Sequence, residues 1–177
     1  KELCRVARER GVLSLVDGAP SFGLLDVNLA DMQTDFYSGS AHKWPCGARE
    51  CGVLYVNKNV QARLWPSIYS AYPGAVGFSR TFEGFGQRDE ATMIAFRAAL
   101  AFQDKVGRAA IEQRARDLTS QLMAGLSKMP GIKMWTSPAP ELRAAIVSLM
   151  TTAGIASSRS RSERKRPRTS FRPIASK

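Results

Sequence analysis

The chemistry of this chain is best sought at Lys43, which stands between His42, the only histidine of the protein, and Trp44. Lysine is normally a solvated surface residue. An apolar or cationic neighbourhood disfavours its charged form and makes the amine a usable nucleophile. One chemistry that needs such a lysine is an imine with pyridoxal phosphate, for which the protein also supplies a carboxylate for the pyridinium nitrogen and donors for the phosphate.

A candidate for the carboxylate is Asp17, which follows the apolar run 12–16. This run is typical of a strand buried on both faces, as in a parallel sheet covered by helices. Asp17 would then stand at the carboxyl end of the strand, where open α/β sheets bind ligands. The phosphate donors would be Ser40 and His42, with backbone amides of the turn around them. Taken singly, Asp17 could equally cap a helix, and Lys43 could lie on a solvated face.

Together these residues form a pattern that resembles a known family. The run Val16-Asp17-Gly18-Ala19-Pro20 is followed, 26 residues after Asp17, by the lysine of Ser40-Ala41-His42-Lys43. The chain thereby resembles the class V aminotransferases, fold-type I pyridoxal-phosphate enzymes that include cysteine desulfurases and isopenicillin N epimerase. The resemblance continues through 52–56 and 86–89, and fades after about Met150.

The resemblance implies a role for each candidate residue. Lys43 would carry pyridoxal 5'-phosphate as an internal aldimine, Asp17 would contact the pyridinium nitrogen, and Ser40 and His42 would hold the phosphate. The family commonly has a glutamine where this chain has Pro20, which cannot make that contact to the phenolic oxygen. Gln87 replaces a threonine that contributes to the phosphate site of the partner subunit.

The resemblance further implies an amino-acid substrate and a homodimer. Epimerisation, transamination, desulfuration and elimination share these residues, so the pattern does not choose among them. The stretch 86–89 is nearest to the isopenicillin N epimerase type.

The expected fold class is α/β, part of a fold-type I large domain with a mixed, mostly parallel sheet, followed by the start of a small α/β domain. The expected domains are 1–106 for the cofactor-binding part, 107–150 for the small domain and 151–177 for a basic tail. The hydrophobic pattern predicts helices over 1–10, within 21–35, over 90–106 and over 108–128. It predicts strands over 12–16, 35–39, 51–56, 132–135 and 144–149. Residues 59–89 are predicted to form a long irregular segment.

Composition adds constraints on the class of protein. The three cysteines, Cys4, Cys46 and Cys51, are few and odd in number, which favours a reducing compartment over a disulfide scaffold. Cys46 and Cys51 lack the paired spacing of a zinc site, so we expect no metal. No apolar run approaches the roughly eighteen residues that cross a bilayer. We therefore expect a cytoplasmic protein that does not bind membranes, although an export signal before residue 1 stays open.

The net charge of +11 is concentrated near the C-terminus, where residues 151–177 hold eight basic residues against Glu163 alone. Such a composition predicts a disordered segment. Two alternatives to an active enzyme follow. The chain could be a truncated, non-catalytic fragment, since it opens inside a helical pattern and the second domain is cut short. It could also bind nucleic acid through the basic tail.

Overall fold

The computed structural model describes residues 1–68, 77–84 and 86–152. The chain forms two compact units, residues 1–115 and residues 116 onward, so the change of unit falls inside α5. The elements, in chain order, are α1 (Glu2–Glu9), β1 (Leu15–Asp17), α2 (Leu29–Met32), β2 (Phe36–Ser40), β3 (Gly52–Val56), η1 (Lys58–Arg63), α3 (Phe78–Glu83), α4 (Glu90–Val106), α5 (Arg108–Leu126), β4 (Ile132–Met134), η2 (Pro140–Leu142) and β5 (Leu149–Thr151).

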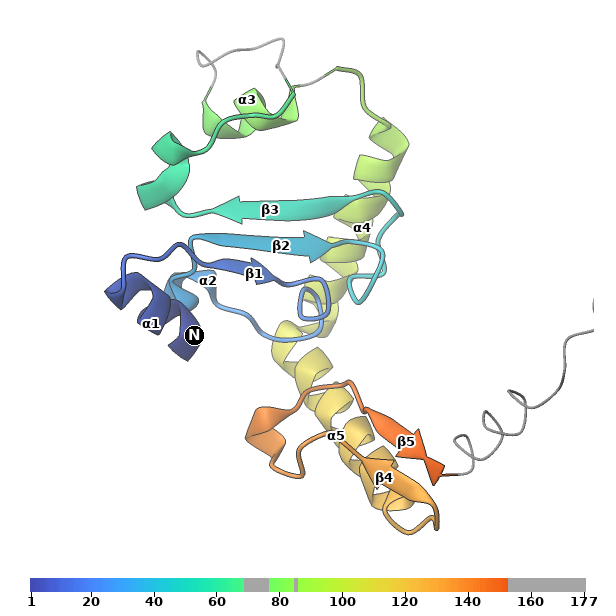
Figure 1. Cartoon of the computed structure of the whole chain (residues 1–177). Helices are drawn as coiled ribbons and strands as arrows, with labels where there is room; N and C mark the ends of the chain where they lie inside the picture. The colour runs from blue at the N-terminus through green and yellow to red at the C-terminus, as the bar shows by residue number, and fades with distance from the viewer. Residues whose placement is uncertain (69–76, 85, 153–177) are drawn as a thin grey trace, which may run out of the picture. The chain divides into compact units, whose positions relative to one another are not determined.

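The first unit contains a three-stranded sheet in the order β1-β2-β3 (Figure 1). Strands β1 and β2 are parallel, with Asp17 opposite Ser38. Strands β2 and β3 are antiparallel, with Ser40 opposite Gly52. The expected α/β class with a mixed sheet is therefore confirmed.

Polar contacts at the start of β1 and β2 fix the register of this sheet. The Asp35 carboxylate accepts hydrogen bonds from the backbone N–H of Ser14 at 2.8 Å and from its hydroxyl at 3.0 Å. Thr34 is fully buried, and its hydroxyl donates to the carbonyl of Phe36 at 2.9 Å. Because a slip of one residue would break these contacts and turn every side chain to the other face, the pairing of Leu15 with Phe36 is strongly specified.

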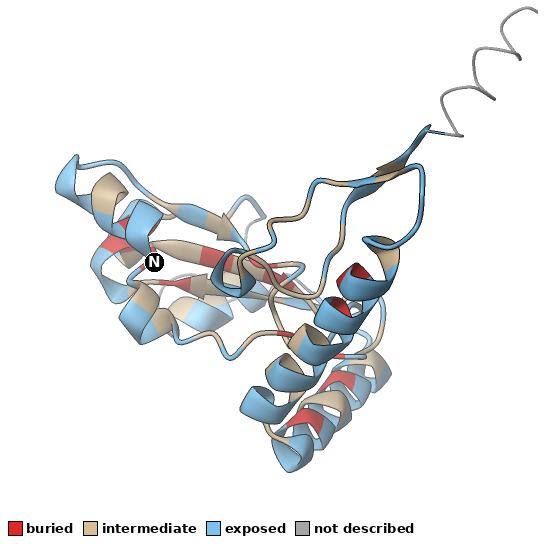
Figure 2. Cartoon of the chain, turned by 90° about the horizontal axis from the view of Figure 1, so that it is seen from below, coloured by how far each residue is buried: buried red, intermediate tan, exposed pale blue. Residues whose placement is uncertain are grey.

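The prediction that β1 is buried on both faces is wrong. Leu15 is 68% exposed, and the strand covers only three residues. Within the described residues β1 has a strand neighbour on one side only, so it is an edge strand. The buried positions of the sheet are Tyr37 and Gly39 on β2 and Val56 at the end of β3. Figure 2 draws buried residues in red.

Helix α4 has the predicted bounds. The Asp89 carboxylate accepts from the backbone N–H of Thr92, which satisfies one of the unpaired donors at the helix start. Phe96 and Gln103 form its buried face. Phe96 packs edge-on against Phe22, at 6.3 Å between ring centroids, so α4 covers the segment that follows β1.

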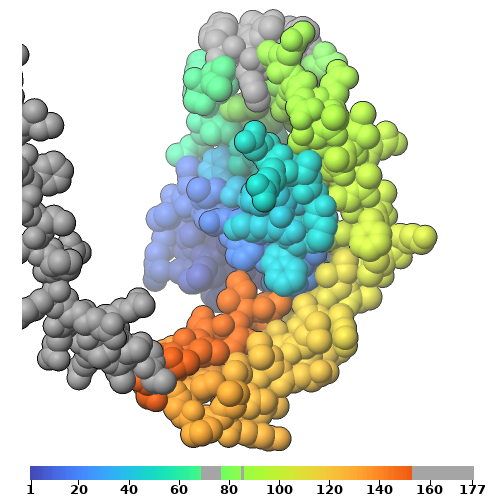
Figure 3. All heavy atoms as spheres, turned by 90° about the vertical axis from the view of Figure 1, so that its right-hand side faces the viewer, coloured from blue at the N-terminus to red at the C-terminus, as the bar shows by residue number. Residues whose placement is uncertain are grey.

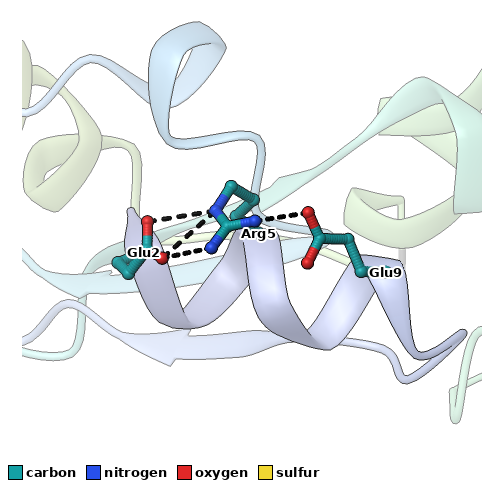
Figure 4. A network of polar contacts seen from close by, with 3 residues as sticks. All are labelled: Glu2, Arg5 and Glu9. Carbon is teal, nitrogen blue, oxygen red and sulfur yellow. Dashed lines mark hydrogen bonds and ion pairs between the residues drawn. The ribbon is translucent and has the colours of Figure 1, made fainter.

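Helix α1 carries a cluster of charges on its surface. The Arg5 guanidinium binds the carboxylates of Glu2 and Glu9, three residues before it and four residues after it (Figure 4). Cys4, the residue before Arg5, is the buried position of the helix. Gly11 follows with a φ of 65°, a left-handed conformation that suits glycine and ends the helix as expected.

Two other predictions need correction. The segment 59–89 is not irregular throughout, because it contains most of η1 and all of α3, with residues 69–76 and 85 outside the described residues. The strand expected at 144–149 lies later, at Leu149–Thr151. The backbone N–H of Trp135 donates to the carbonyl of Ser148 next to the paired strands. The register of β4 with β5 then places 149–151 opposite 132–134.

In the second unit β4 and β5 form an antiparallel pair. Arg143 donates to the carbonyl of Pro138 at 2.8 Å and to the hydroxyl of Ser120 at 3.1 Å, which ties the loop after β4 to α5. The predicted boundary between 106 and 107 stays a prediction. The predicted disorder of the tail lies outside the described residues from position 153 onward.

Candidate functional site

Asp17 and Ser40 lie at the same edge of the sheet. Asp17 is the last residue of β1, and Ser40 is the last residue of the parallel strand β2. Asp17 pairs with Ser38, and residues that alternate along a strand share a face, so the side chains of Asp17 and Ser40 belong to one face of the sheet. This is the carboxyl edge of the parallel pair, where α/β folds bind ligands.

The turn after Asp17 is held from inside the protein. The Asp17 carboxylate accepts from the backbone N–H of Ala19 at 3.0 Å, while the carbonyl of Gly18 accepts from the backbone N–H groups of Ser21 and Phe22 at 2.9 and 2.7 Å. Tyr37, only 2% exposed, lies beneath this turn. Its hydroxyl donates to the Gly18 carbonyl at 3.4 Å and lies 3.0 Å from the Ser21 hydroxyl.

The electrostatics of Tyr37 reflect this position. Burial raises the pKa of Tyr37 above its ordinary value of 10.0, the hydrogen bond with Ser21 opposes the rise, and the negative charge of Asp17 adds to it. The tyrosine is therefore neutral at physiological pH and can donate to the turn.

Lys43 lies in the turn that connects β2 to β3. The fully buried Ala41 anchors this turn: its N–H donates to Cys51 at 2.9 Å, and its carbonyl accepts from Gly47 at 2.7 Å. The Lys43 carbonyl accepts from the N–H of Cys46 at 3.0 Å. His42 and Lys43 are exposed beyond the anchor, and the turn, drawn in cyan, reaches the surface of the first unit (Figure 3).

The side chains predicted to hold the cofactor make few polar contacts with other side chains of the described residues. Within the described residues, the side chains of Ser40, His42 and Lys43 have no hydrogen-bond or ion-pair partner, and the Asp17 carboxylate has only the local contact with Ala19. A carboxylate, a hydroxyl, an imidazole and an amine match the ring nitrogen, the phosphate and the aldehyde of pyridoxal phosphate. The residues present therefore fit that group chemically. The register places Asp17 and Ser40 on one face at the same edge of the sheet, and His42 and Lys43 follow Ser40 in the chain.

Gln87 lies apart from these four residues along the chain. It lines a hollow of about 390 Å³ at the start of α4, together with Gly52, Cys51 and Arg88. Because Gly52 is the strand partner of Ser40, this hollow adjoins the end of β2. Among the described residues, no hydrogen bond or ion pair joins Gln87 to Asp17 or Lys43.

Sequence reasoning missed the contacts that hold the two segments together. Gln103 on α4 is 8% exposed, and its side-chain amide donates to the carbonyls of Gly23 and Trp44 at 3.0 and 2.9 Å. One signal was available, because Gln103 is a polar residue seven positions after Phe96 in the apolar stripe of the helix. Such a residue must find buried partners.

The three cysteines differ in burial and form no disulfide. Cys4 is buried, Cys46 exposed and Cys51 half-buried, all as free thiols. Within residues 1–68, 77–84 and 86–152, no three side chains of the metal-binding types gather around one point. No helix in that part of the chain has the length and apolar character needed to span a membrane.

Comparison with known proteins places this site in a family context. The sequence model described as Aminotransferase class-V matches residues 1–160. Isopenicillin N epimerase of Streptomyces clavuligerus is 33% identical over 168 residues, which cover 86% of this chain and 42% of the epimerase.

Two solved structures share the fold. The apo structure of a cysteine desulfurase from Thermococcus onnurineus NA1 has a TM-score of 0.75 at 22% identity, over 91% of this chain and 43% of that one. A variant of C-DES with glycine covalently linked to its pyridoxal-phosphate cofactor has a TM-score of 0.68 at 23% identity, over 85% of this chain and 43% of that one. The chain thus spans less than half the length of each of these proteins.

Proposed function

This chain belongs to the class-V aminotransferase family, whose cofactor is pyridoxal 5'-phosphate, and from that premise we propose that it forms part of the cofactor site of an enzyme acting on amino acids. The observation that carries the proposal is the shared sheet edge, where Asp17 and Ser40 end two parallel strands and the turn with Lys43 follows directly. Asp17, Ser40, His42, Lys43 and Gln87 are the residues proposed to hold the cofactor.

Each side chain would have a defined task. The Asp17 carboxylate would keep a proton on the ring nitrogen, because a negative charge beside that nitrogen favours its protonated form. Ser40 and His42 would orient the ring by donating hydrogen bonds to the phosphate. Bound pyridoxal phosphate supplies an electron-withdrawing ring for the negative charge that develops at the substrate Cα.

Lys43 would have two tasks in sequence. Its Nζ atom would hold the cofactor at its aldehyde carbon. The same Nζ atom, when free, would remove or return the proton at the substrate Cα. Lys43 is exposed in the turn beyond the buried Ala41, so its side chain is accessible to a ligand from solvent.

The proposal is tested by locating the cofactor. We expect the chain, incubated with pyridoxal phosphate and reduced with borohydride, to carry the adduct on Lys43, as read by peptide mass spectrometry. Lys43→Ala should abolish the visible absorption band of the bound cofactor. Lys58→Ala, which changes an exposed lysine in η1, should leave it intact. An adduct on any other lysine, or no adduct, would contradict the proposed function.

For the reaction, we propose the epimerase type, supported by the 33% identity to isopenicillin N epimerase. Such an enzyme exchanges the Cα proton of an L-amino acid and inverts that centre. In D₂O we expect deuterium at Cα, detected by NMR across a panel of amino acids that includes cysteine. Conversion of cysteine to alanine, with its sulfur passed to an added thiol as a persulfide, would instead assign the desulfurase type.

The intact enzyme is proposed to be a homodimer, in which Gln87 of one copy approaches the phosphate of the other. Sedimentation velocity with and without pyridoxal phosphate tests this. A species of twice the chain mass should form, and Gln87→Ala should weaken cofactor binding. A monomer at all concentrations with full cofactor affinity would exclude the shared site.

A further inference from the structure

One buried side chain connects the two segments that carry Asp17 and Lys43. The segment after β1 contains Gly23, and the turn after β2 contains Trp44. The amide nitrogen of Gln103 lies 3.0 Å from the carbonyl oxygen of Gly23 and 2.9 Å from that of Trp44. A side-chain amide has two N–H donors, so each segment can receive one of them.

Two backbone positions near this amide make tight contacts. Gly23 has a φ of 78°, and a Cβ at this position would lie 2.7 Å from the ring of the fully buried Pro45. A Cβ on Gly47, in the same turn as Lys43, would lie 3.0 Å from the ring of Phe96 on α4. A side chain at Gly23 would therefore force a shift, and one at Gly47 would be tight against Phe96.

The side-chain amide of Gln103 is therefore the polar contact between the segment with Gly23 and the turn with Trp44, whose other contacts here are apolar. Removing it would leave the carbonyl oxygen of Gly23 without a donor and that of Trp44 with only the weak contact from the Cys46 thiol at 3.5 Å. Losing a donor to a part-buried carbonyl is costly. Within the described residues, no other hydrogen bond or ion pair joins these two segments beyond the pairing of β1 with β2, so we expect them to shift relative to one another. A shift of about 1 Å between reacting groups is enough to slow a reaction strongly.

We propose that Gln103 is a positioning residue that sets the distance between the amine of Lys43 and the carboxylate of Asp17. This inference rests on the proposed function. It predicts that the Gln103 amide affects the affinity for a ligand that must contact both segments at once. Pyridoxal phosphate would be such a ligand, because it would contact Asp17 and bond to Lys43. Pyridoxamine phosphate lacks the aldehyde, so it would use Asp17 and the phosphate donors without a bond to the lysine.

The test compares Gln103→Met with Gln61→Met. Gln61 also donates its amide to a backbone carbonyl, that of Val56 at 3.3 Å, but it lies in η1. Dissociation constants for both cofactor forms are measured on folded protein, with circular dichroism to confirm folding. For Gln103→Met we expect pyridoxal phosphate to bind about tenfold more weakly and pyridoxamine phosphate to be almost unaffected. Gln61→Met should change neither constant.

Gln103→Glu supplies a second arm in case the methionine variant does not fold. A carboxylate cannot donate to the two carbonyls, whereas its protonated form can donate to one. The ratio of its pyridoxal-phosphate affinity to that of the unaltered chain should therefore recover as the pH falls from 8 to 5.

The positioning role would be overturned if Gln103→Met weakened the binding of both cofactor forms equally. It would also be overturned if Gln103→Met weakened neither and the affinity ratio for Gln103→Glu did not change with pH. The proposed function fails separately, when the unaltered chain gives no adduct on Lys43, and the positioning role then fails with it.

Discussion

The ring of Tyr37 fills the space that any side chain on Gly18 would need. Its Cζ atom lies 2.0 Å from the place of a Cβ on Gly18, and its hydroxyl donates to the carbonyl of the same residue. Tyr37 is buried in the middle of β2, and Gly18 directly follows Asp17. The tyrosine therefore determines both the residue type and the conformation of the turn that presents the candidate carboxylate.

Gly18→Ala should consequently destabilise the protein. The added methyl group cannot be accommodated unless the buried Tyr37 ring moves, and overpacking of this kind costs about 1–3 kcal/mol. The free energy of unfolding from urea titration measures the effect. Gly125→Ala is the matched control, because nothing lies within 4 Å of its Cβ and it is inside α5. Alanine there should stabilise by about 0.5–1 kcal/mol. Equal effects at both positions would show that Tyr37 does not constrain Gly18.

Stability at alkaline pH should depend on Tyr37. Its folded pKa is raised by burial above the ordinary 10.0, so the unfolded chain loses the phenolic proton first. The stabilisation is complete below pH 10 and is lost as the pH rises through the folded pKa. Tyr37→Phe should remove the part of the stability loss at alkaline pH that is due to Tyr37, as measured by the melting temperature between pH 8 and 11.5. Tyr55→Phe, which changes the cross-strand partner, should retain it. A Tyr37→Phe curve parallel to that of the unaltered chain would argue against the assignment.

How far the sequence predicts this structure depends on the range of the interactions involved. Helix α4 was predicted with correct bounds, because its apolar stripe and the cap at Asp89 are local signals. The burial of β1 was predicted wrongly, since it depends on which elements cover the strand, as the exposure of Leu15 shows. The apolar stripe of α4 could indicate that Gln103 is buried, but its partner Gly23 lies 80 residues away, so no local pattern could identify that partner.

The start of α4 should be sensitive to acid. Two hydrogen bonds to the Asp89 carboxylate lower its pKa: the larger effect comes from the Thr92 hydroxyl and the smaller from the Thr92 backbone N–H. A lowered folded pKa gives stability that is present above the unfolded pKa and lost as the pH falls through the folded one. Asp89→Ala should lower the melting temperature at pH 7 but not at pH 2. Asp89→Asn, which keeps an acceptor for the Thr92 N–H, should be milder at pH 7. A loss for Asp89→Ala that is the same at both pH values would contradict a charged cap.

The three thiols should react in the order of their exposure. Cys46 is exposed at the end of the turn with Lys43, Cys51 is half-buried, and Cys4 is 6% exposed on α1. With a thiol-specific chromogenic reagent at pH 8, we expect one fast reaction that Cys46→Ser abolishes. The Cys4 reaction should be at least about 100-fold slower, because it requires local opening of α1, and it should become fast in guanidinium. Bound pyridoxal phosphate should slow the Cys46 reaction if the turn closes over the cofactor at Lys43. Rapid labelling of Cys4 in the absence of denaturant would show that α1 does not pack as described.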